Sequence, residues 1–132
     1  MTYVTDTHPL VFYAVGNLGS LSARCTKIFR RAEQGRDRVH VPSVCFFEIA
    51  MLMERGRIQS AVGFDGWYAL VTQQPGFQVE PLLWEDVREA RALASLVDPF
   101  DRLIAGTAVR IGASLMTSDK RIGASGLVPT LW

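Results

Sequence analysis

Four acidic residues, spread widely along the chain, are the side chains best suited to chemistry. Two of them follow short apolar runs, one opens a periodic apolar segment, and one lies inside an apolar segment. Hard divalent cations such as Mg²⁺ and Mn²⁺ prefer oxygen ligands, which carboxylates from several segments can supply. Carboxylates gathered without a cation repel one another strongly. The candidate catalytic and metal-binding residues are therefore Asp6, Glu48, Asp101 and Asp119.

Glu48 is the acid that ordinary folding explains least well. Its neighbours from Val44 to Met53 are all apolar, so the helix that carries it is expected to be buried. A buried carboxylate is usually paired, neutralised or bound to a metal. The alternatives are a buried salt bridge to an arginine and a position on a thin exposed strip of the helix.

The other three acids each have a structural alternative, because carboxylates are common at helix starts. Asp98 and Pro99 suit the N-cap and first position of a helix in which Asp101 is the third residue. Asp6 suits the cap of a helix that follows it, and Asp119 suits the cap of a short turn. Their interpretation as ligands depends on all four acids meeting in space.

The elements that would position these acids alternate between strands and helices. Strands are predicted over 3–5, 39–41, 77–80, 114–117 and 128–131, and helices over 9–15, 22–34, 43–55, 64–73, 83–96 and 100–111. This order predicts an α/β fold with a central, mostly parallel sheet. Ligands of such sheets bind beyond the carboxyl ends of the strands. Asp6 and Asp119 each lie just past a predicted strand end.

Composition bounds the class of protein. The 132 residues are expected to form a single domain, 1–132, and 48% of them are apolar. The net charge of +1 gives no global basic field. Cys25 and Cys45 provide neither a disulfide framework nor zinc-ligand spacing, which favours a reduced, cytoplasmic setting. We expect no signal peptide and no membrane association.

Four segments carry a resemblance to a known family. They are Val4-Thr5-Asp6-Thr7-His8, the helix 43–56 with Phe47-Glu48-Ile49-Ala50, Asp98-Pro99-Phe100-Asp101-Arg102-Leu103-Ile104-Ala105, and Leu115-Met116-Thr117-Ser118-Asp119. In order and spacing they resemble the motifs of the PIN-domain nucleases, particularly the VapC-like toxins of bacterial toxin–antitoxin pairs. The resemblance spans nearly the whole chain.

The resemblance implies a three-layer PIN-like fold and a Mg²⁺- or Mn²⁺-dependent endoribonuclease that hydrolyses RNA with a metal-activated water. It also implies a homodimer and a cognate antitoxin that occludes the site. The four candidate acids match the acids of the family, Thr117 matches a supporting hydroxyl, and Thr7 and Asp98 are further supporting residues. Relatives often carry a lysine about one turn after the central glutamate, where this chain has Leu52-Met53.

The residues that would hold the RNA are harder to identify. Arg30 and Arg31 lie on a basic helix and Arg102 follows Asp101, so all three are candidate RNA contacts. For the basic helix, the alternative is a solvated face. An alternative function is a non-catalytic PIN-like module that binds RNA or protein. The intact set of acids argues against that alternative.

Overall fold

The computed structural model describes all 132 residues as an α/β fold around one parallel sheet. The strands are β1 (Thr2–Thr5), β2 (Arg38–Pro42), β3 (Phe77–Glu80), β4 (Ser114–Met116) and β5 (Thr130–Leu131). The helices are α1 (Thr7–Ala14), α2 (Ala23–Glu33), α3 (Ser43–Glu54), α4 (Gly63–Thr72), α5 (Trp84–Arg91), α6 (Pro99–Ile111) and α7 (Lys120–Ala124), with a 3₁₀ turn η1 (Leu18–Ser20).

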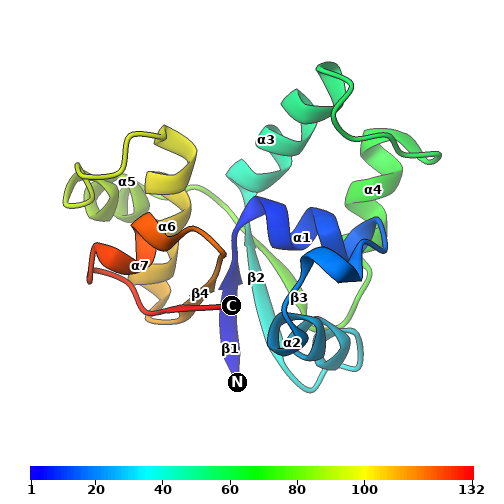
Figure 1. Ribbon diagram of the computed structural model, residues 1–132, viewed down its shortest axis with the longest axis horizontal. Helices are drawn as coiled ribbons and strands as arrows, with labels where there is room; N and C mark the ends of the chain where they lie inside the picture. The colour runs from blue at the N-terminus through cyan, green and yellow to red at the C-terminus, as the bar shows by residue number, and fades with distance from the viewer.

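The sheet has the strand order β3-β2-β1-β4-β5, and every neighbouring pair is parallel. In Figure 1, α1, α2 and α4 lie on one side of the strands, and α5, α6 and α7 lie on the other. This arrangement confirms the predicted α/β class with helices flanking a central sheet. This order places β1 in the centre of the sheet. The segment after β1 therefore leaves the sheet between the segments that follow β2 and β4.

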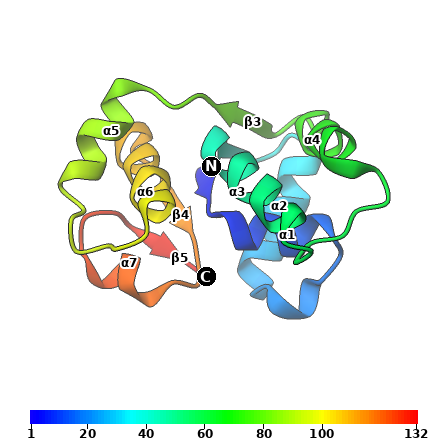
Figure 2. The same ribbon diagram turned by 90° about the horizontal axis from the view of Figure 1, so that it is seen from above.

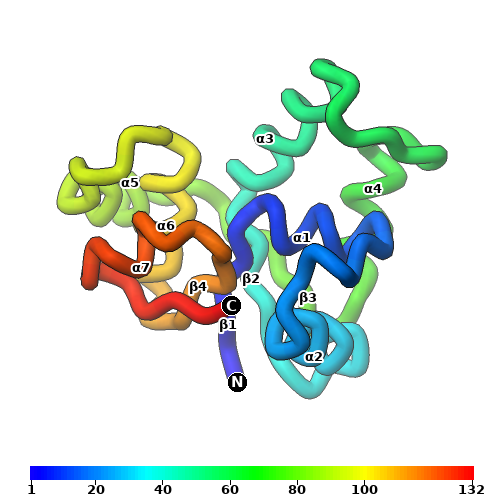
Figure 3. Tube along the Cα trace, viewed as in Figure 1, coloured from blue at the N-terminus to red at the C-terminus, as the bar shows by residue number.

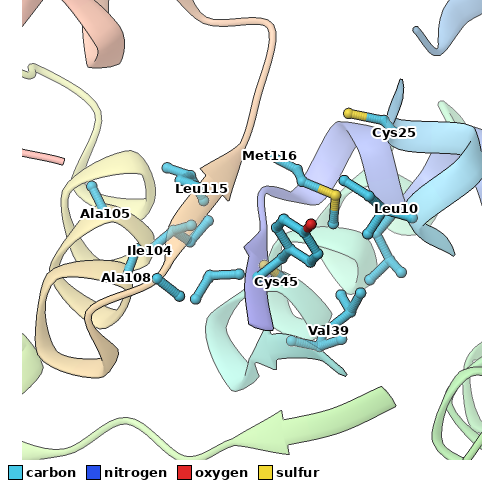
Figure 4. Packing of buried hydrophobic residues seen from close by; sticks show 14 of the residues in the cluster. Leu10, Cys25, Val39, Cys45, Ile104, Ala105, Ala108, Leu115 and Met116 are labelled. Atoms are coloured by element: carbon cyan, nitrogen blue, oxygen red, sulfur yellow. The ribbon is translucent and has the colours of Figure 1, made fainter. Parts of the chain in front are cut away.

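The two faces of the sheet pack against different helices because side chains alternate along a strand. Leu115 of β4 lies toward Ile104 and Ala108 of α6, whereas Met116 lies toward Leu10 of α1 (Figure 4). All five of these side chains are buried. The core therefore fixes the rotation of α1 and α6 relative to the strands, and with it the residues at their first turns.

Helix boundaries differ from the sequence predictions at several ends. α1 begins at Thr7 rather than Pro9, so Pro9 lies in its first turn. Proline is tolerated there because the N–H groups of a first turn have no intrahelical partner, and the missing N–H costs no hydrogen bond. α5 ends at Arg91 rather than Leu96. Beyond it the backbone forms tight turns, with the N–H of Leu93 bonded to the carbonyl of Ala90 at 3.1 Å. α7 was not predicted as a helix.

The predicted burial of the glutamate-bearing helix is only partly right. On α3, Cys45, Phe46 and Ile49 are buried, but Phe47 is 60% exposed. One face of this apolar helix is therefore open. Figure 3 shows that the connector from α3 to α4 extends outward from the rest of the chain.

A buried polar network joins the edge of the sheet to α5 and α6. His40 Nδ1 lies 2.6 Å from Glu80 Oε1, and Arg110 Nη2 donates to Glu80 Oε2 at 3.2 Å. Arg110 Nε donates to Asp86 Oδ1, and the other oxygen of Asp86 accepts from the N–H of Leu83 at 2.9 Å. The single arginine thus pairs with two buried carboxylates.

The helices α5 and α6 pack closely through Gly106. A Cβ at that position would lie 2.6 Å from the carbonyl oxygen of Asp86. The close contact holds α6, and the acids near its first turn, against the rest of this layer. None of the helices is long and apolar enough to cross a membrane.

Candidate functional site

Asp6 lies where the central strand β1 passes into α1. Its Oδ1 accepts the N–H of Thr7 at 2.8 Å, which makes it the N-cap of α1. Its Oδ2 accepts the hydroxyl of Thr117 at 2.7 Å. The capping role that the sequence suggested is therefore present, but it occupies only one oxygen. The side chain is buried and held in one orientation by two donors.

Glu48 lies in the middle of α3 and faces the same end of the sheet. Its Oε1 accepts the hydroxyl of Thr7 at 2.6 Å. It forms no salt bridge, so the alternative of an arginine partner is wrong. Glu48 is half-buried rather than fully buried, because the side of α3 next to Phe47 is open.

Asp98 and Asp101 lie at the start of α6. Asp98 is the N-cap, and its Oδ1 accepts the N–H groups of Phe100 at 2.8 Å and Asp101 at 3.1 Å. Pro99 is the first helical residue, as predicted. The Asp101 carboxylate accepts no hydrogen bond from any protein donor, and it lines the same pocket as Asp6.

Thr117 and Asp119 follow β4, the neighbour of β1. The hydroxyl of Thr117 donates to Asp6 and accepts the N–H of Asp119 at 3.1 Å, so it links the ends of two strands. Asp119 is the N-cap of α7. Arg121 Nε and Nη2 donate to its two oxygens at 3.1 and 3.0 Å.

The four predicted acids line one pocket of about 470 Å³ at the carboxyl ends of β1 and β4. Figure 2 views the molecule from above, at the end where β1 leads into α1. The pocket is lined by Asp6, His8, Phe12, Glu48, Asp98, Asp101, Thr117, Ser118, Asp119 and Arg121. The fold thus brings together acids from four separate segments. The lining also includes Asp98, and Thr7 supports Glu48 from just outside it.

The electrostatics of the pocket are those of crowded carboxylates. Burial, with Asp6, Asp98, Asp119 and Glu48 nearby, raises the pKa of Asp101 to about 7. Burial also raises the pKa of Asp6 and of Glu48, although hydrogen bonds from Thr117 and Thr7 oppose it. The pKa of Asp119 is lowered, mainly by its hydrogen bonds from Arg121.

This donor set fits a hard divalent cation. Carboxylate oxygens are the ligands that Mg²⁺ and Mn²⁺ prefer, and a cation would offset both the burial and the repulsion between acids that raise the pKa of Asp101. As the side chains stand, no three His, Cys, Asp or Glu residues converge closely enough to enclose an ion. The residues that could hold one are the four acids that line this pocket, Asp6, Glu48, Asp101 and Asp119.

The three arginines suggested as RNA contacts lie elsewhere. Arg102 donates through Nε and Nη2 to the carbonyl of Ala90 at 3.2 and 3.0 Å. Arg31 pairs with Asp37, with its Nε 2.7 Å from Oδ2. Arg30 lines an apolar pocket between α1, α2 and α4. None of the three lines the carboxylate pocket.

Arg121 is a charged pocket residue that the sequence analysis missed, as it missed the lining residues Phe12 and Ser118. Its position two residues after Asp119, at the start of a helix, allows it to fold back onto that carboxylate. The signal available in the sequence was an arginine two residues after a candidate metal-binding acid. The sequence did not predict that α7 would be helical, and without that helix the side chain of Arg121 had no predicted direction.

The raised pKa values predict an unusual dependence of stability on pH. The carboxyl of Asp101 keeps its proton up to about pH 7 in the folded, metal-free protein but only to about 3.8 when unfolded. The folded chain binds more protons between these values, so its free energy of unfolding falls as pH rises across this window and levels off above about 7. We expect the metal-free protein to melt at a lower temperature near pH 8 than near pH 5.5.

Calorimetry of the chelator-treated protein checks this dependence. Mg²⁺ is expected to raise the melting temperature more near pH 8 than near pH 5.5, because protons compete for its ligands. The variant Asp101→Asn should show a flatter profile, with the remaining slope due to Asp6 and Glu48. A wild-type melting temperature that rises between these two pH values would contradict the assignment.

Comparisons with known proteins show the family of this chain and its fold. The PIN domain family model matches residues 3–124. The chain is similar to Ribonuclease VapC22 of Mycobacterium tuberculosis (strain ATCC 25618 / H37Rv), with 32% identity over 94 residues, which are 70% of this chain and 71% of the relative.

Two solved structures share the fold. The TM-score is 0.73, at 12% identity, to a chain of VapBC2 from Rickettsia felis bound to a DNA fragment from its promoter, covering 99% of this chain and 98% of the other. It is 0.64, at 14% identity, to a chain of VapBC-1 from nontypeable Haemophilus influenzae, covering 99% and 97%. At these identities the likeness shows the fold alone.

Proposed function

This chain belongs to the PIN-domain family, and on that premise we propose that it is a divalent-metal-dependent endoribonuclease. The observation that carries the proposal is the pocket itself. Acids from four segments meet at the carboxyl ends of the central strands, and burial together with the neighbouring carboxylates raises the pKa of Asp101 to about 7. Such crowding is unfavourable unless a cation offsets it. The relative named Ribonuclease VapC22 supports RNA as the substrate.

The residues of the chain have separable tasks in this mechanism. Asp6, Glu48, Asp101 and Asp119 would hold Mg²⁺ or Mn²⁺. When bound, such a cation lowers the pKa of a water and stabilises negative charge on phosphate oxygens. The hydroxyl of Thr117 holds Asp6 Oδ2, and the hydroxyl of Thr7 holds Glu48 Oε1. Both threonines thereby fix the direction of carboxylates before the substrate arrives.

We extend the proposal to partners. The structural neighbours are described as VapBC complexes, which supports a role as the toxin of a toxin–antitoxin pair with a cognate antitoxin. A homodimer in the cytoplasm follows from the same proposal, and both cysteines are free and buried, which suits a reducing compartment. Arrest of growth on expression, relieved by co-expressing the product of the adjacent gene, would support this role. Normal growth would contradict it.

Removal of metal is the direct test of the enzyme. Purified protein incubated with single-stranded RNA and Mg²⁺ or Mn²⁺ should cleave it, and an excess of EDTA should stop cleavage until Mg²⁺ is restored. The products are separated on a denaturing gel. Cleavage that persists in EDTA would contradict the role of the carboxylate pocket. Binding of RNA without cleavage under all metal conditions would favour the non-catalytic module.

A further inference from the structure

The carboxylate pocket has a shortage of positive charge for its proposed substrate. Five acidic side chains line it, and each phosphate of RNA adds a negative charge. The only potentially cationic side chains among the lining residues are His8 and Arg121. A metal ion offsets charge at the reacting phosphate, but the neighbouring phosphates of the strand also approach this acidic rim.

Three other arginines already have partners in the structure. Arg102 bonds the carbonyl of Ala90, and Arg110 is held by Asp86 and Glu80. Arg31 is paired with Asp37 at the other end of the sheet, where β2 begins. None of these three arginines lines the carboxylate pocket, and each forms its hydrogen bonds outside it.

Arg121 has spare donors and open space. Its guanidinium carries five N–H groups, and the two bonds from Nε and Nη2 to Asp119 leave three for a ligand. The Arg121 side chain is 76% exposed, whereas that of Asp119 is 21% exposed. One edge of the Arg121 guanidinium is therefore bound to Asp119, and the other edge is exposed to solvent. This arrangement reduces the conformational entropy that the side chain loses on binding.

We propose that Arg121 binds an RNA phosphate next to the reacting one, while Asp119 orients its guanidinium. This inference rests on the proposed ribonuclease function. Arginine suits the task because its planar, permanently charged group donates two parallel hydrogen bonds to phosphate oxygens. The donors that Asp119 leaves free include one N–H of Nη1 and the second N–H of Nη2, which point in the same direction and can supply such a pair.

Binding of RNA in a cleavage-deficient background tests the proposal. The Glu48→Gln protein, alone or combined with Arg121→Ala or Arg121→Lys, is titrated into fluorescent single-stranded RNA at several salt concentrations. Arg121→Ala should weaken binding about tenfold, the effect expected for losing hydrogen bonds to a charged group. It should also lower the slope of log Kd against log salt by about 0.7, which corresponds to one phosphate contact on a single strand. Arg121→Lys should restore most of the slope.

Lys120→Ala is the matched control, because Lys120 is an exposed neighbour that does not line the pocket. It removes the same charge and should change Kd by less than about twofold, since an exposed charge that makes no direct contact with the RNA is screened by salt. An unchanged affinity and salt slope in Arg121→Ala would overturn the proposal. So would an Arg121→Ala protein that, in the wild-type background, loses kcat alone, because Arg121 would then only position Asp119.

The two proposals fail in different ways. Cleavage by the wild-type protein reports on the ribonuclease function, whereas the comparison of binding slopes reports on Arg121. A wild-type protein that cleaves RNA, together with equal slopes for Arg121→Ala and its parent, would reject the role of Arg121 and keep the enzyme. Absence of cleavage by the wild-type protein would reject the enzyme itself.

Discussion

Replacing Glu48 with glutamine is expected to lower the rate of RNA cleavage by about a thousandfold, which corresponds to several kcal/mol of lost charge stabilisation. Glutamine keeps the size of the side chain and can still accept the hydroxyl of Thr7, which lies 2.6 Å from Oε1. It removes the negative charge that would hold the cation. The change therefore tests the charge of Glu48 separately from its shape.

The Glu48→Gln protein should still adopt the native fold. The pKa of Glu48 is raised by burial and by the nearby charge of Asp6, so loss of its charge relieves repulsion in the metal-free protein. We expect the melting temperature without metal to stay level or rise, and its increase on adding Mg²⁺ to shrink. Calorimetry and gel-based cleavage rates measure the two effects in parallel.

Glu54→Gln is the control for Glu48→Gln. Glu54 is the last residue of the same helix, is exposed and does not line the pocket. It should cleave RNA at the wild-type rate. Equal cleavage by Glu48→Gln and wild type would show that Glu48 is not catalytic, and Asp6→Asn would then decide whether any acid of the pocket is needed.

Replacing Arg110 with methionine is expected to have the largest effect on stability, a loss of about 3–5 kcal/mol in the free energy of unfolding. Arg110 is the only cation paired with both Asp86, which is 0% exposed, and Glu80. Methionine fills similar space but leaves buried Asp86 without its ion-pair partner and leaves Glu80 with His40 alone. Uncompensated buried charge is costly, so the folded state is destabilised relative to the unfolded chain.

Urea denaturation measures this loss. Arg88→Met is the matched control, because Arg88 is an exposed residue of α5 that forms no ion pair, and it should change stability by at most about 0.5 kcal/mol. Combining Arg110→Met with Asp86→Asn should recover part of the loss, since the two residues are coupled. An Arg110→Met protein as stable as wild type would show that the network is not needed to hold α5 and α6 to the sheet.

The sequence by itself determined the class of fold and the identity of the acids. Alternating apolar strands and amphipathic helices specify a parallel α/β sheet, because the period of the apolar residues is a local property. Pro99 and Asp98 marked the start of α6 for the same local reason, and the structure confirms both positions. Glu48 was notable because a carboxylate amid apolar neighbours needs an explanation wherever it lies.

Only the tertiary structure decided how these residues meet. The strand order brings the end of β1 beside that of β4, so Thr117 reaches Asp6 across 111 residues of chain. No local pattern encodes that pairing, because it depends on which strands are neighbours. The same holds for Phe47, which an apolar helix predicted as buried and which lies on an open face. The arginines are a further case. The tertiary structure places Arg102 where it donates to the carbonyl of Ala90, and it places Arg121 in the lining of the pocket.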